Sequence, residues 1–244
     1  MTAPQRRAIA AIILGVAGTA TLIALCLWQL QRLDWKLGLI ASLEERLSAE
    51  PVALPAAPTP DDEFLRVSVT GRFEGREGTH GFTDAPLLTT FDKQAGYRVL
   101  QPFTLTDGRR IMVSRGWVPL AAKNAGGRAA LPTPAPEGTV TLTGALRFPD
   151  DPQSPAFGAT DNVWIARDLS VMAAVFDVEP VLLVSETPTP GPGVRAPLLQ
   201  PLTVNLKNDH LGYAITWGLL AAVWALMSGI LAFREWRKRA EASA

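Results

Sequence analysis

Residues 8–30 have the sequence AIAAIILGVAGTATLIALCLWQL, which contains no charged side chain and only one strongly polar one, Gln29. A second uncharged stretch of the same length, LGYAITWGLLAAVWALMSGILAF, covers residues 211–233. At 1.5 Å per residue each stretch would form a helix about 34 Å long, enough to cross the hydrocarbon core of a bilayer. The two stretches therefore predict transmembrane helices near each terminus. The alternative, a pair of buried core helices, is unusual for helices that are apolar on every face.

The first stretch also has features of a secretory signal peptide. Its apolar part is longer than such peptides need, however, and its small residues, Gly18 to Ala20, lie inside it and not after it. Leu25 is bulkier than the residue that normally precedes a lipidated cysteine. We therefore expect an uncleaved anchor. Cys26 is the one cysteine in the chain, so no intramolecular disulfide can form.

Basic residues next to the spans predict their orientation, because lysine and arginine are enriched on the cytoplasmic side. Residues 1–7 and 234–244 are predicted to be cytoplasmic tails, and residues 31–210 a domain on the opposite side. In a bacterium this is the periplasmic side of the inner (cell) membrane, and in a mitochondrion the intermembrane-space side of the inner membrane. Arg6 and Arg7 precede the first span, but Arg32, Lys36 and Arg46 follow it and weaken the argument there. The orientation is therefore decided by the cluster after the second span, which is Arg234, Arg237, Lys238 and Arg239.

Residues 31–210 are predicted to form a β-rich, mainly antiparallel α+β domain. Apolar residues at helical spacing predict a short amphipathic helix over 34–49. Four prolines within residues 51–60 then predict a stiff, extended linker that is not packed on the domain. Further along, alternation of apolar and polar residues predicts a strand from Leu65, which Gly71 ends or bulges.

A β-hairpin is predicted where Asp107-Gly108 separates two β-rich runs, residues 97–105 and 110–118. Asp-Gly is typical of a tight turn in which both residues have positive φ. The remaining elements expected are strands over 139–147 and 180–185 and a helix over 168–176, with Asp168 as its N-cap.

The composition argues against several functions. Acidic and basic residues balance at 23 each, so no bulk positive charge indicates nucleic-acid binding. The only histidines are His80 and His210, too few for a usual metal site of three or four protein ligands. Ser114 and Asp92 are present, but a serine without a nearby base is not an activated nucleophile. We therefore expect no enzymatic activity, with a periplasmic enzyme or a transporter accessory as a third alternative.

The entry to the second span, NDHLGYAITW at residues 208–217, carries the most distinctive pattern. In a helix, successive residues are rotated by about 100°, and this places a stripe of aromatic residues on one face that begins at the imidazole of His210. The alternative without a binding role is that the aromatic residues form an ordinary belt at the membrane interface and that the histidine lies in water. The residues on this face are His210, Tyr213, Ala214, Trp217, Ala221 and Trp224.

Trp28, Gln29 and Arg32 leave the first span at the level where His210 enters the second. If the spans pack together, these residues and His210 would line one pocket. Small residues on one face of each span favour close packing, although such residues are common in transmembrane helices. They are Ala11, Gly15 and Gly18 in the first span, and Gly218, Ala222, Ala225 and Gly229 in the second.

These motifs resemble the Surfeit locus protein 1 family of cytochrome c oxidase assembly proteins. The resemblance covers nearly the whole chain and rests on four stretches in the family's order. They are Trp28-Gln-Leu-Gln-Arg32 with Trp35-Lys36, Gly71-Arg-Phe73, Gly96-Tyr97 leading to Ser114-Arg-Gly-Trp-Val-Pro119, and residues 208–217. The family often has Asn where this chain has Ser114 and Asp209.

The resemblance implies a non-enzymatic assembly factor that binds haem a and assists its delivery to, or retention in, the haem-bearing core subunit of a haem–copper oxidase. Haem a synthase is a further implied partner. The implied iron ligand is His210, and Arg32 or Lys207 would meet the propionates. Asp209 would favour the charged imidazole and so oppose ligation. The implied haem-binding residues are His210, Tyr213, Trp217, Trp28 and Arg32.

Two alternatives stay open. The chain is either a haem-binding factor or a membrane scaffold that binds the oxidase core subunit without haem. Arg115, Gly116 and Trp117 either contact a partner or are structural, with Gly116 relieving a tight strand end and Trp117 packing in the core.

Overall fold

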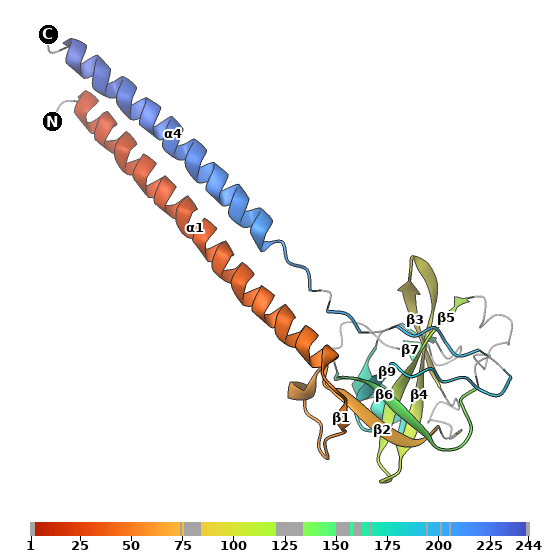
Figure 1. Ribbon diagram of the computed structural model, residues 1–244. Coiled ribbons are helices and arrows are strands. Elements are labelled where there is room, and N and C mark those ends of the chain that lie inside the picture. Colours follow the sequence, from red (N-terminus) through yellow and green to blue (C-terminus); the bar gives the residue numbers. More distant parts are fainter. Residues whose placement is uncertain are drawn as a thin grey trace. The chain divides into compact units, whose positions relative to one another are not determined.

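The computed structural model describes residues 3–73, 75, 84–120, 134–149, 157–158, 163–165, 167–193, 195–200, 202–204 and 206–242. The chain divides into two compact units. One contains Met1–Ser42 and Val204–Ala244 and is a pair of helices; the other contains Leu43–Thr203 and holds the sheet (Figure 1).

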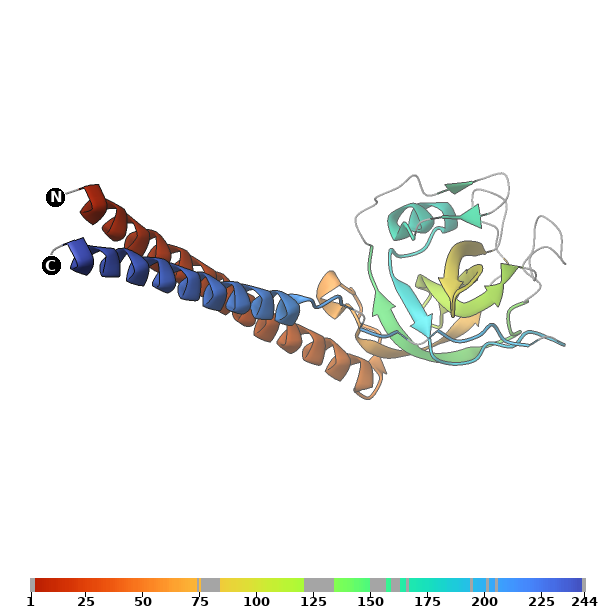
Figure 2. The same ribbon diagram turned by 90° about the horizontal axis from the view of Figure 1, so that it is seen from above.

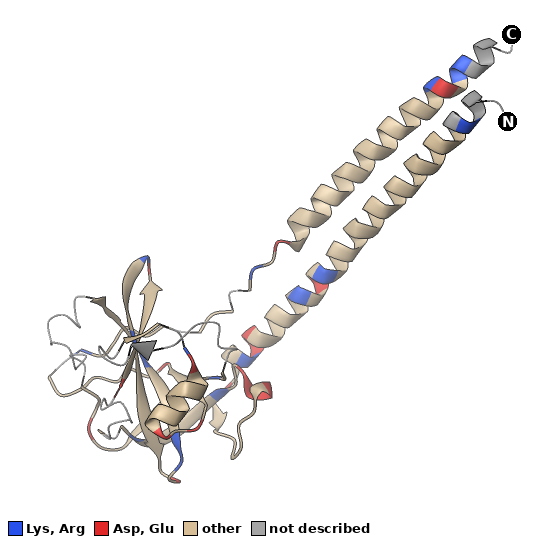
Figure 3. Cartoon of the chain, turned by 180° about the vertical axis from the view of Figure 1, so that it is seen from behind, with Lys and Arg blue, Asp and Glu red and all other residues tan. Residues whose placement is uncertain are grey.

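The helical unit contains α1 (Ala3–Ser48) up to Ser42 and α4 (His210–Ala242), and these two helices lie side by side (Figures 1 and 2). Both helices are long and apolar enough to cross a membrane. Many of their large apolar side chains are exposed, for example Leu14 and Leu226 at 66% and 65%. The N-terminal part of α1 and most of α4 carry no charge between their ends (Figure 3). An exposed apolar surface of this extent is typical of a region that contacts a membrane or another protein.

Helix α1 continues without a break from the predicted first span through the predicted amphipathic helix over 34–49. Several charged residues that follow the apolar stretch, such as Lys36 and Glu44, are good helix formers, so the charge there does not end the helix. It ends just before Pro51, which cannot continue a helix from the preceding turn.

The other unit is a nine-stranded mixed sheet in the order β1-β2-β6-β9-β5-β4-β3-β8-β7. An additional pairing of β2 with β4 joins β2, β6, β9, β5 and β4 into a closed ring, so the sheet is barrel-like. The strands are β1 (Val52–Ala53), β2 (Arg66–Phe73), β3 (Ala85–Phe91), β4 (Gln94–Leu105), β5 (Arg110–Pro119), β6 (Val140–Arg147), β7 (Phe157–Gly158), β8 (Val163–Trp164) and β9 (Leu182–Ser185).

Most pairings are antiparallel, as predicted, but the sheet is not purely so. Strands β1 and β2, β3 and β8, and β5 and β9 pair in parallel. Parallel pairing requires long connections, which local sequence patterns do not show.

Glycine at position 71 allows the ring to close. It lies within β2 and pairs with Val140 of β6 on one side and with Leu105 of β4 on the other. A Cβ atom there would collide with the carbonyl oxygen of Thr104. The expectation that Gly71 ends or bulges the strand is therefore wrong, because β2 runs on to Phe73.

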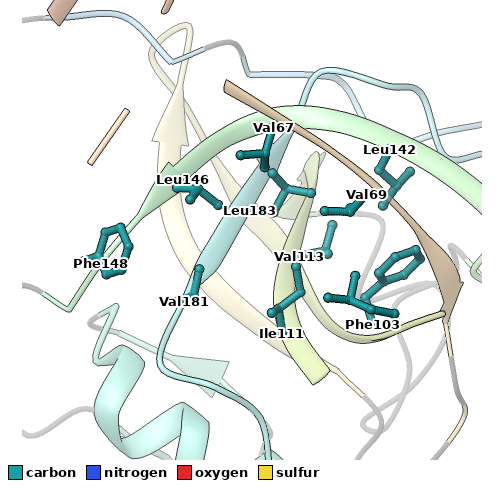
Figure 4. Packing of buried hydrophobic residues seen from close by; sticks show 11 residues of the cluster. Val67, Val69, Phe103, Ile111, Val113, Leu142, Leu146, Phe148, Val181 and Leu183 are labelled. Carbon is teal, nitrogen blue, oxygen red and sulfur yellow. The ribbon is translucent and has the colours of Figure 1, made fainter. Parts of the chain in front are cut away.

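The interior of the ring is filled by apolar side chains from all five of its strands (Figure 4). A second apolar cluster lies between the sheet and helix α3 (Leu169–Phe176), and it includes Met112 of β5 and Leu182 of β9. Strand β9 is thus covered on both faces, which explains why all four of its residues are buried. The first cluster contains Val67, Val69, Phe103, Leu105, Ile111, Val113, Leu142, Leu146, Phe148, Val181 and Leu183.

Several local predictions are confirmed. Strands β6 and β9 and helix α3 lie where expected, and Asp168 caps α3 by accepting a hydrogen bond from the Val171 N–H at 3.0 Å. The hairpin of β4 and β5 is also present. Its turn differs from the prediction, because only Gly108 has positive φ, while Asp107 accepts from the Arg109 N–H at 3.0 Å. The turn with two positive φ values is instead Asp92-Lys93, between β3 and β4.

The proline-rich segment 51–60 is more than an unpacked linker, so that prediction is wrong. It contains β1, and Leu54 packs against the interior of the ring. Arg109 Nη1 donates to the carbonyl oxygen of Pro55 at 2.8 Å. A short helical turn η1 (Pro60–Asp62) follows.

Candidate functional site

His210 is the first residue of α4 and is half-buried. Its ring Nδ1 lies 2.8 Å from the side-chain Oε1 of Gln29 on α1. An amide oxygen can only accept a hydrogen bond, so this contact is a hydrogen bond in the form of the ring that carries a proton on Nδ1. Gln29 is only 8% exposed. The strongly polar residue of the first apolar stretch is therefore directed at the histidine that starts the second helix.

Close packing of α1 and α4 brings these two residues together. A Cβ atom on Gly15 would lie 2.7 Å from Cβ of Ser228, and one on Gly18 would collide with the indole of Trp224. A Cβ atom on Gly218 would lie 3.7 Å from Sγ of Cys26. The predicted packing through small residues holds for these three glycines.

The face of α4 that meets α1 differs in part from the predicted face. Ala214 and Ala221 are buried, at 3% and 5% exposed. Ala222, which was predicted to face α1, is exposed. Gly229, also predicted, has no described atom within 4 Å of the position that a Cβ atom would take. The helix pair therefore uses residues of the predicted aromatic stripe. Within that stripe Trp217 is half-buried, while Tyr213 is 55% exposed.

Of the three α1 residues predicted to share a pocket with His210, the structure brings Gln29 to hydrogen-bonding distance. Trp28 is 51% exposed. The guanidinium of Arg32 lies 4.7 Å from the ring centre of Trp35 on the same helix, which is a cation–π contact. Trp28 and Arg32 thus present an aromatic ring and a positive charge on the surface of α1.

Two charged residues precede the histidine. Lys207 Nζ lies 2.8 Å from Asp209 Oδ2, and this partner raises the pKa of the lysine. The backbone oxygen of Asp209 accepts from the Tyr213 N–H at 3.2 Å. The Asp209 carboxylate is therefore paired with Lys207 at the exposed approach to α4.

A multidentate metal site is not found in the described part of the chain, since no three His, Cys, Asp or Glu residues cluster there. The other histidine, His80, lies outside the described residues.

Arg115 lies at the second predicted site and is only 1% exposed. Its guanidinium donates to Thr189 Oγ1 at 3.1 Å, to Gln101 Oε1 at 3.0 Å and to two backbone oxygens, those of Thr189 and Pro134. Burial lowers the pKa of Arg115 to about 10. The side chain ties two loops to the sheet instead of facing a partner.

Trp117 and Gly116 also have structural positions. Trp117 is 3% exposed, and its backbone exchanges hydrogen bonds with Leu198 at 2.7 and 2.8 Å. Gly116 has φ of +125°, and a Cβ atom there would lie 2.5 Å from the Leu198 oxygen. The side chains of Arg115 and Trp117 are covered within the domain, as the structural alternative expects, and direct contact with a partner stays a prediction. The sequence does contain a signal for the buried hydrogen-bond network of Arg115, because this residue is the only charged one within the otherwise mostly apolar run 111–118.

The fold and the site together define a chain with one barrel-like unit and one unit of two long apolar helices, in which a histidine–glutamine contact lies where the second helix begins. The sequence model of the SURF1 family matches residues 16–222, and the chain belongs to this family. It is 36% identical to Surfeit locus protein 1 of Homo sapiens over 226 residues, which covers 83% of this chain and 71% of the human protein. It is 35% identical to the SURF1-like protein of Monosiga brevicollis, covering 82% and 79%.

Proposed function

We propose that this protein is a non-enzymatic assembly factor for cytochrome c oxidase that binds haem a where α1 and α4 meet near His210. It would assist delivery of haem to the oxidase core subunit, or its retention there. Membership of the SURF1 family supports the assembly role. The haem role rests on the residues of the site.

The observation that carries the haem proposal is the position of His210. An imidazole is an ordinary axial ligand of haem iron, and ligating histidines usually hydrogen-bond through their other ring nitrogen. Gln29 accepts such a bond from Nδ1. Tyr213, Trp217 and Trp28 would offer apolar ring surface, and Arg32 would meet a propionate, since Lys207 is engaged by Asp209.

The exposed apolar surface of both helices supports insertion in a membrane, with helix α4 ending in a basic segment (Figure 3). We propose that both termini are cytoplasmic and that the barrel-like domain is periplasmic, or lies in the intermembrane space if the protein is mitochondrial. Haem a synthase would then be able to meet the site within the same membrane.

The test is to purify the full chain from cells that make haem a and to record its visible spectrum. A haem band that is lost in His210→Ala and kept in His80→Ala supports ligation by His210. No band in the unchanged chain, or an equal band in both variants, contradicts it.

A scaffold that binds the core subunit without haem is the second candidate. It is favoured by two exposed apolar residues that directly follow the paired residues Leu87 and Trp164. Leu88 of β3 is 41% exposed, and Ile165, just after the end of β8, is 65% exposed. This candidate predicts that oxidase assembly survives His210→Ala and fails in Leu88→Asp together with Ile165→Asp. The opposite pattern supports the haem-binding candidate.

A further inference from the structure

The contact between Gln29 and His210 joins two residues that are 181 positions apart in sequence. Gln29 is buried, whereas its neighbours Trp28 and Leu30 are 51% and 41% exposed. A buried polar side chain in an apolar helix is costly unless it is hydrogen-bonded. The glutamine is therefore held in one arrangement by its contact with the histidine.

We propose that Gln29 is a positioning residue that fixes the protonation pattern of the His210 ring. A neutral imidazole carries one proton, on Nδ1 or on Nε2. The amide oxygen of Gln29 stabilises the form protonated on Nδ1, which leaves the lone pair on Nε2. Gln29 thereby selects the ring nitrogen through which His210 can bind an electrophile or a metal.

The charged groups near His210 do not provide this selection. Lys207 and Asp209 pair with each other at 2.8 Å, and Asp209 uses its backbone oxygen within α4. Gln29 lies on a different helix, α1, and its Oε1 is in direct contact with Nδ1 of His210. Gln29 also differs from Gln31, which is exposed on the same helix and serves as the matched control.

A disulfide can hold the helix pair in place during the test. A Cβ atom on residue 218 would lie 3.7 Å from Sγ of Cys26, so Gly218→Cys would place a second sulfur atom close to that of Cys26. Failure of this disulfide to form on oxidation would overturn the helix pairing on which the proposal depends.

The experiment uses the full chain in lipid nanodiscs, locked by this disulfide, without haem and at a pH where the ring is neutral. His80→Gln leaves His210 as the one histidine, and ¹⁵N-labelled histidine reports which ring nitrogen carries the proton. We expect protonated Nδ1 in the unchanged background, in Gln29→Glu and in Gln31→Met. We expect a mixture of both forms in Gln29→Met, which keeps the length of the side chain but has no strong acceptor. Protonated Nε2 in the unchanged background, or an identical pattern in Gln29→Met, would overturn the proposal.

The link to haem rests on the proposed function and is measured separately. If His210 ligates haem, loss of its hydrogen-bond partner lowers haem affinity roughly 10–100-fold. We expect this loss in Gln29→Met and not in Gln31→Met; equal affinities would show that Gln29 does not influence ligation. Because the ring protonation is read without haem, failure of haem binding leaves that result intact.

Discussion

The indole of Trp224 on α4 lies against Gly18 of α1, so that a Cβ atom on residue 18 would lie 2.7 Å from Cε2 of the ring. The tryptophan is still 40% exposed, so only part of its ring is used in the helix contact. The smallest residue on one helix thus accommodates the largest on the other. The same contact sets the helix separation that lets Gln29 reach His210.

Gly18→Leu should separate the helices, because a branched side chain cannot share the space of the indole. We expect the disulfide between Cys26 and residue 218 in Gly218→Cys to fall to background yield when Gly18→Leu is added. Non-reducing electrophoresis after mild oxidation measures this yield. Gly38→Leu is the matched control on α1, since no described atom lies within 4 Å of a Cβ position there. A full yield in Gly18→Leu would contradict the packing.

Arg115→Met should destabilise the domain by about 3 kcal/mol, because it leaves buried acceptors on Gln101, Thr189 and Pro134 without a donor. Burial lowers the pKa of Arg115 to about 10, so the group stays charged near neutral pH. Raising the pH through that value would remove the charge, and with it part of the burial cost. The difference in the free energy of unfolding between the unchanged chain and Arg115→Met should therefore be constant near neutral pH. Urea unfolding of the full chain in detergent measures it, with exposed Arg195→Met as the control; a loss below 1 kcal/mol would count against the network.

Gly71→Ala should destabilise the domain by about 3 kcal/mol, since its methyl group would meet the Thr104 carbonyl where β2 and β4 close the ring. Gly75→Ala should change stability by less than about 0.5 kcal/mol, because no described atom lies within 4 Å of its Cβ position. Thermal unfolding followed by circular dichroism compares the two. Equal melting temperatures would argue against the tight crossing.

Lys93→Gly should stabilise the domain by about 1 kcal/mol, because a non-glycine residue at φ of +61° is strained. The melting temperature should rise by roughly 2–4 °C, the usual size for this gain in a domain of this length. Lys93→Ala removes the same long side chain without relieving the backbone, so it should show no such gain. A rise of equal size in Lys93→Ala would assign the effect to the side chain instead.

Sequence patterns predicted the elements whose signals are local. The apolar lengths of α1 and α4, the alternation in β6 and the cap at Asp168 are all features of neighbouring residues. The sequence predicts a span over 8–30 and a separate helix over 34–49, whereas α1 joins the two. Charged residues end a membrane-spanning stretch, but they do not end a helix. The turn of β4 and β5 was predicted in place but not in conformation, since its loop is longer than the two residues assumed.

Contacts between distant residues were the part that local patterns could not supply. The parallel pairing of β5 with β9 joins Ser114 to Val184. The burial of Arg115 depends on loops at residues 134 and 189. At the candidate site, a meeting of Gln29 with His210 could be expected from their equal depth, but which atoms meet depends on the rotation of each helix about its axis.

Strand β9 has a consequence for the order of events during synthesis. It is the last strand in the sequence, yet it lies between β6 and β5 in the sheet. Until residues 182–185 have left the ribosome, the ring has a gap with unpaired edges on β5 and β6. Contacts across such long sequence separations form slowly, and open strand edges invite association with other chains. The edges of β5 and β6 that pair with β9 therefore stay open until nearly the whole domain has been made, so we expect its yield in cells to depend on chaperone capacity.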